Sequence, residues 1–159
     1  MLDKRGLIVG GAALVLAIGA GATWLLPSKS EVGADATNPE LVALGRTVYM
    51  RQCASCHGTH LEGQPNWKER LPSGRLPAPP HDGTGHTWHH SDKQLFDMTK
   101  NGATGILPGY ESDMPPFKGV LTDREILAVL AYIKSSWPPD TRARQERINK
   151  QSEHSDTSQ

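Results

Sequence analysis

The chain has only two cysteines, and both lie in the pentapeptide Cys53-Ala54-Ser55-Cys56-His57. Two thiols at this spacing can bond covalently to the two vinyl groups on one edge of a porphyrin. The histidine that follows directly then places an imidazole under the iron as an axial ligand. The motif therefore predicts one covalent haem c, attached through Cys53 and Cys56, with His57 as an iron ligand.

Three other uses of a C-x-x-C sequence compete with haem attachment. A thioredoxin-like dithiol needs a βαβ context, and this sequence has no strand signal. A zinc site would recruit His57, His60 or His81 as further ligands. The gap from Cys56 to His81 exceeds the spacing of zinc fingers. A disulfide across two intervening residues would close a small, strained loop.

Apolar residues are scarce outside one segment of the chain. Residues 7–26 are rich in them, and the remaining positions are only about 30% apolar, with 16 Gly and 12 Pro in the whole chain. A domain of this composition has a thin core and needs help, such as a cofactor. The 17 basic and 17 acidic residues balance, which excludes a strongly basic nucleic-acid binder.

Residues 7–26 carry no charge and would make a helix about 30 Å long, enough to span a bilayer. Lys4 and Arg5 precede this segment, so the positive-inside rule keeps residues 1–6 in the cytoplasm. We expect a single-pass protein of the inner membrane, in which residues 27–37 link the transmembrane anchor to a periplasmic domain. The alternative is a cleaved signal peptide, with Ala34-Asp35-Ala36 as the cleavage site.

Short local signals predict three helices beyond the linker. Asn38 before a proline is an N-cap, and the sequences Ser91-x-x-Gln94 and Thr122-x-x-Glu125 are capping boxes. No stretch alternates as a strand does, so the fold class is all-α. The Gly- and Pro-rich residues 58–90 should form one long loop that wraps around something. Residues 138–159 are charged and free of aromatics, so we expect a disordered tail.

This arrangement resembles the class I c-type cytochromes. In that family an N-terminal helix leads into the haem motif and a C-terminal helix packs across it. Residues 41–52 and 121–137 match those two helices, and the resemblance covers residues 38–137. It implies a class I cytochrome c fold whose helices meet at four residues. These are Gly45, Tyr49, Val129 and Tyr132.

The resemblance also implies the second iron ligand. Met114-Pro115-Pro116-Phe117 is similar to the family's M-P-x-F segment, which makes Met114 the expected ligand. A thioether is soft, favours Fe(II) and raises the reduction potential. Met98, on a predicted helix, is the alternative ligand. In the family a proline carbonyl accepts a hydrogen bond from the motif histidine, and Pro79 or Pro80 fits that role here.

Four histidines lie between positions 81 and 90, around a tryptophan. The simplest interpretation is that the tryptophan and one or two histidines bind the haem propionates or close the loop. The alternatives are a second metal site, such as a copper site, and a histidine-tuned response to pH. The candidate residues are His81, His86, Trp88, His89 and His90.

These features together predict a one-electron carrier of a respiratory or related redox chain, and not an enzyme. With His57 and Met114 both on the iron, no position is left for a substrate. The expected partners are a membrane electron-donor complex and an acceptor such as a terminal oxidase, and the membrane anchor would raise the local concentration of the domain near both. One alternative is a haem enzyme or gas sensor with a labile distal ligand. The other is a copper-handling or assembly factor that uses the His-rich loop.

Overall fold

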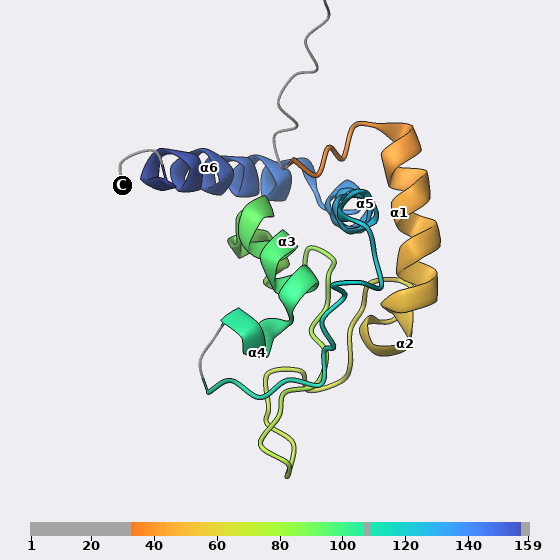
Figure 1. Cartoon of the computed structure of the whole chain (residues 1–159), viewed down its shortest axis with the longest axis vertical. Helices are drawn as coiled ribbons and strands as arrows, with labels where there is room; N and C mark the ends of the chain where they lie inside the picture. The colour runs from red at the N-terminus through yellow and green to blue at the C-terminus, as the bar shows by residue number, and fades with distance from the viewer. Residues whose placement is uncertain (1–32, 107–108, 157–159) are drawn as a thin grey trace, which may run out of the picture.

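The structure is a computed structural model that describes residues 33–106 and 109–156. This part of the chain is helical, with no named strand, which confirms the expected all-α class (Figure 1). Its elements are α1 (Pro39–Gln52), α2 (Ala54–His57), the 3-10 helix η1 (Thr87–His89), α3 (Asp92–Asn101), α4 (Ala103–Ile106), α5 (Asp123–Ser135) and α6 (Pro139–Asp156).

The three predicted helix starts are present as hydrogen-bonded caps. The Asn38 side chain accepts hydrogen bonds from the backbone N–H groups of Glu40 and Leu41 at the start of α1. Both capping boxes are complete, one at Ser91 before α3 and one at Thr122 before α5. Each cap satisfies N–H groups that a helix cannot pair internally. The short helices α2 and α4 were not predicted.

Helices α1 and α5 cross at a glycine, and Figure 1 shows α5 end-on beside α1. A Cβ atom on Gly45 would lie 1.8 Å from the Ala128 carbonyl oxygen, so no larger residue allows this close approach. The Tyr49 and Tyr132 rings pack 5.3 Å apart on the same crossing. Val129 is buried on α5. The helix contact implied by the family resemblance is therefore present.

The expectation of a disordered C-terminal tail is wrong for residues 139–156, which form α6. Composition pointed to disorder because this segment has few apolar side chains to bury. The helix is held by polar groups instead: Gln145 is fully buried and donates to Asp92, and Asn149 accepts from the Asp92 backbone N–H. In Figure 1, α6 accordingly lies across the N-terminal end of α3.

The expected transmembrane anchor at residues 7–26 lies outside the described residues, as do residues 1–6. None of the helices within residues 33–106 and 109–156 has the length and apolar character needed to cross a bilayer.

Candidate functional site

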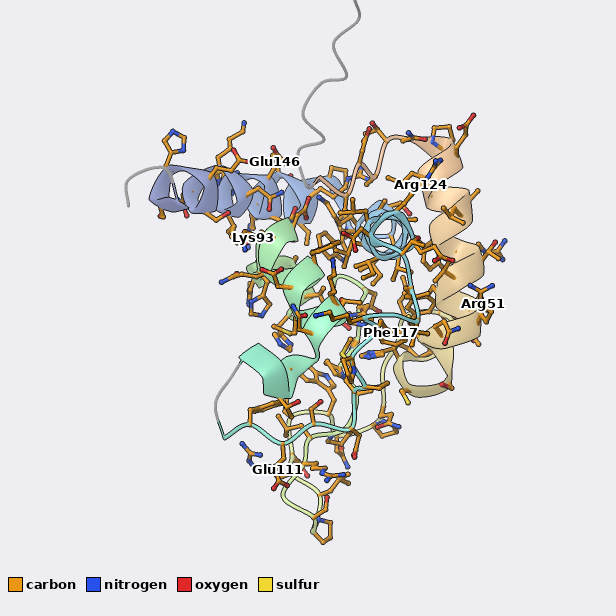
Figure 2. The ribbon with its side chains drawn as sticks, in the orientation of Figure 1. Arg51, Lys93, Glu111, Phe117, Arg124 and Glu146 are labelled. Atoms are coloured by element: carbon orange, nitrogen blue, oxygen red, sulfur yellow. The ribbon has the colours of Figure 1, made fainter. Side chains whose placement is uncertain are left out.

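The Gly- and Pro-rich loop of residues 58–90, helices α3 and α5 and the segment before α5 line a cavity of about 550 Å³. Leu95 of α3 and three residues of α5 form an apolar wall, with Phe117 from the segment before α5. Figure 2 shows Phe117 in the middle of the domain, below α5. Among the residues that the sequence singled out, the thiol, imidazole and thioether side chains that line this cavity are those of Cys53, Cys56, His57, His81, His86, His90, Met98 and Met114.

The C-x-x-C-H motif bends sharply at the end of α1 and continues as the single turn α2. The backbone N–H groups of Cys56 and His57 both donate to the Cys53 carbonyl, at 3.1 and 3.0 Å. The buried Tyr49 hydroxyl donates to the Gly58 carbonyl at 2.9 Å, which fastens the far end of the motif to α1. These bonds bring both thiols and the imidazole to one cavity.

The two cysteines are not joined to each other in a disulfide, so both sulfur atoms are available for attachment. Burial, with a smaller effect of the nearby Cys56, raises the pKa of Cys53 to about 11. Cys53 is therefore uncharged at neutral pH, in keeping with the apolar surroundings. A thioether is uncharged as well, so covalent attachment to haem adds no buried charge to this wall.

His57 is oriented by a backbone carbonyl. Its Nδ1 lies 2.9 Å from the Pro79 oxygen, which can only accept, so Nδ1 carries the proton. The structure thus assigns to Pro79 the role for which Pro79 and Pro80 were candidates. Burial lowers the pKa of His57 below its usual value. The ring is neutral near pH 7, with Nε2 as its unprotonated nitrogen, which is the form that ligates a metal.

Two thioethers line the cavity. Met98 lies on α3, whereas Met114 lies on an irregular segment where its backbone N–H donates to the Ser112 hydroxyl. Met114 is partly buried and packs against the core, while Met50 is 46% exposed and does not line the cavity. Because both side chains line the cavity, either methionine is placed to supply a thioether ligand.

The His-rich loop divides into two groups. His81, His86 and His90 line the cavity, whereas Trp88 and His89 do not. The Trp88 indole donates to the Gly85 carbonyl and packs edge-on against His89, so it closes the loop on itself. Within residues 33–106 and 109–156 no three His, Cys, Asp or Glu side chains gather in a way that could hold a metal ion.

Several residues of the site were missed in the sequence. Trp67 lines the cavity and stacks on His86, with ring centroids 5.3 Å apart. Thr87 is buried and hydrogen-bonds to the His81 ring at 2.9 Å. Trp67 could have been identified in the sequence as an aromatic residue inside a polar loop. Nothing in the sequence singles out Thr87, because its contact with the His81 ring depends on the fold of the loop.

The donor set of this cavity fits a covalently bound haem. Two cysteine side chains outside any disulfide and a neutral, oriented imidazole come from one short motif, and thioethers come from distant segments. The apolar wall of α3 and α5 suits a flat, largely apolar ring.

Comparison with known proteins agrees with this geometry. The model of the cytochrome c family matches residues 42–137. The crystal structure of cytochrome CL from the marine methylotrophic bacterium Methylophaga aminisulfidivorans matches with a TM-score of 0.50 and 27% sequence identity. That match covers 69% of this chain and 63% of cytochrome CL, so this chain spans less than two thirds of that protein. No curated protein matches the chain.

The family match covers more than half of the chain and includes most of α1, the C-x-x-C-H motif, α3 and α5. Covalent haem c follows from it, because Cys53 and Cys56 occupy the C-x-x-C-H motif. The chain therefore belongs to the cytochrome c family and holds haem c.

Proposed function

We propose that this protein carries single electrons in a respiratory or related redox chain, with His57 and Met114 as the axial ligands of its haem iron. The observation that carries the proposal is the hydrogen bond from His57 Nδ1 to the Pro79 oxygen. It leaves Nε2 as the ligating nitrogen, in a cavity that a thioether also lines.

When bound, haem c supplies a reversible one-electron change between Fe(II) and Fe(III). The residues of this chain determine where that change occurs and at what potential. Cys53 and Cys56 attach the group, His57 ligates the iron, and the apolar wall keeps water and polar groups away from it. A thioether ligand raises the potential, and two filled axial positions leave no place for a substrate. These properties suit a carrier and not an enzyme.

Met114 is a better ligand than Met98 for a structural reason. It stands before two prolines, which keep the backbone extended and out of a helix. The segment is then fastened at Phe117, whose backbone N–H donates to the Thr99 carbonyl at 3.1 Å. Met98, by contrast, lies within the regular helix α3.

Replacing Met114 with alanine tests the ligation, with Met98→Ala as the matched control. Met114→Ala should abolish the weak near-infrared band of ferric His/Met haem and lower the potential, because Fe(II) loses its soft ligand. It should also allow CO and azide to bind. Met98→Ala should keep the band. The reverse result would show that Met98 is the ligand, and a wild-type protein that lacks the band and binds CO would favour the haem enzyme or gas sensor.

We also propose that residues 7–26 hold the protein at the periplasmic face of the membrane, near a membrane donor and an acceptor such as a terminal oxidase. Ala34 supports an uncleaved chain, because it is 1% exposed and its N–H donates to the buried Asp92 carboxylate. Cleavage at Ala36 would remove this contact. Sequencing the N-terminus of the mature protein from membrane and soluble fractions is the test, and a soluble product that starts near Thr37 would contradict the anchor.

A further inference from the structure

A second histidine ring lies against the ligand histidine. The ring of His81 stacks on that of His57, with centroids 4.0 Å apart and planes inclined by 22°. The two residues come from different segments, the haem motif and the His-rich loop, so the contact is a product of the fold. Neither haem attachment nor the Pro79 hydrogen bond requires a ring in this place.

The His81 ring is itself held firmly. Its Nδ1 is hydrogen-bonded to the hydroxyl of the buried Thr87 at 2.9 Å. Its backbone N–H donates to the Leu61 carbonyl at 2.8 Å, and its own carbonyl accepts from the Trp137 indole at 2.7 Å. The Tyr49 and His81 rings meet edge to face, with centroids 6.4 Å apart. Contacts from four segments therefore determine where this imidazole lies.

We propose that His81 is a positioning residue that determines the orientation of the His57 ring plane. A single hydrogen bond to Pro79 allows the His57 ring to rock about the line between nitrogen and oxygen. A flat partner stacked on one face of the ring opposes that motion. The inference rests on His57 ligation, which is part of the proposed function. Groups around an axial ligand tune both its orientation and the potential of the iron.

The chain supplies a matched comparison in His86. This histidine lies in the same loop and lines the same cavity, but it stacks on Trp67 and packs edge-on against His90, 5.6 Å away. It has no contact with the His57 ring among its ring contacts. A general effect of losing a cavity histidine should therefore appear in both variants, and a positioning effect only at His81.

The experiment compares holo-proteins of the full chain with His81→Leu, His81→Phe and His86→Leu. Three quantities are measured: the g-values of the ferric haem by electron paramagnetic resonance, the reduction potential, and the near-infrared band of Met ligation. His81→Leu should broaden and shift the g-values and shift the potential, because the His57 ring then samples more orientations. His81→Phe, which keeps a flat ring, should restore most of the wild-type spectrum. Any shift in His86→Leu should be smaller than in His81→Leu, because His86 lines the cavity without a ring contact to His57.

Wild-type g-values and potential in His81→Leu would overturn the proposal, as would equal shifts in His86→Leu. If His81→Leu does not accumulate, Thr87→Val replaces it, since that change keeps the His81 ring but removes its hydrogen bond. Thr87→Val should then broaden the g-values, and an unchanged spectrum would count against the proposal. If the proposed axial ligation is itself wrong, the near-infrared band will be missing from the wild-type protein. That outcome is distinct from failure of the His81 proposal, in which the wild-type protein shows the band and His81→Leu leaves the g-values unchanged.

Discussion

The two sides of the haem cavity are held in different ways. The proximal wall, residues 53–61 and 77–87, is fastened by buried or partly buried hydrogen bonds, such as those from His57 to Pro79 and between His81 and Thr87. The distal wall, residues 109–117, is fastened at its outer part by ion pairs from Arg75 to Glu111 and Asp113. Figure 2 shows Glu111 in the lower lobe, away from α6.

This contrast bears on which ligand is easier to displace. The three side chains of the distal ion pairs are 43%, 72% and 61% exposed, and pairs in that environment contribute little. The partly buried bonds of the proximal wall are screened much less by salt. We therefore expect His57 to stay on the iron under conditions that release the distal thioether. Three experiments test this contrast, from the largest expected effect to the smallest.

Replacing Cys56 with alanine should have the largest effect. It removes one of the two attachment points of haem on the proximal wall, so most of the mature holo-protein should be lost, whereas Met114→Ala should accumulate normally. Haem staining of denatured protein after acid-acetone extraction measures this. Ser55→Ala, at the exposed position between the cysteines, is the control and should behave as wild type. Haem that extracts freely from the wild-type chain would contradict covalent attachment.

Asp92→Asn should destabilise the distal wall through α3. The Lys134 and Asp92 side chains are 9% and 7% exposed and pair at 2.7 Å, and α3 in turn accepts the Phe117 backbone N–H. An uncompensated buried lysine should cost about 3–5 kcal/mol of unfolding free energy. Denaturant titration should show the near-infrared band disappearing at lower concentration than in wild type.

Asp97→Asn is the matched control for that experiment. It is the same substitution on the same helix, but Asp97 pairs with the exposed Lys93 at 2.7 Å. Its loss should change the unfolding free energy by less than about 1 kcal/mol. Equal destabilisation by the two variants would show that the Asp92 pair has no special role.

Arg75→Gln should have the smallest effect and should be confined to the distal wall. It removes both ion pairs of the loop that carries Met114, so the affinity for azide should rise by at most about fivefold at low salt. The difference from wild type should shrink at high salt, because exposed pairs are screened. Arg70 is the control, because its side chain donates to the carbonyl of Gly74, the residue before Arg75. Arg70→Gln should not change azide affinity. A salt-independent rise in azide affinity would show that Arg75 acts by another route.

Local features could be predicted from the sequence because the interactions involved lie close along the chain. The capping boxes at Ser91 and Thr122 join residues three apart, and the spacing of Cys53, Cys56 and His57 matches the edge of a porphyrin. The helix crossing at Gly45 came from the family resemblance, and the close approach of Ala128 explains it physically.

Interactions between distant segments were open until the fold was known. Pro79 and Pro80 are equivalent in sequence, and the path of the loop brings the Pro79 carbonyl to His57. The segment that forms α6 was predicted to be disordered because it has few apolar side chains. It is held by polar contacts instead, from Gln145 to the Asp92 carboxylate and from the Asp92 backbone N–H to Asn149. The stacking of His81 on His57 has the same origin. Each of these contacts depends on where the backbone places two polar groups, and no local pattern encodes that distance.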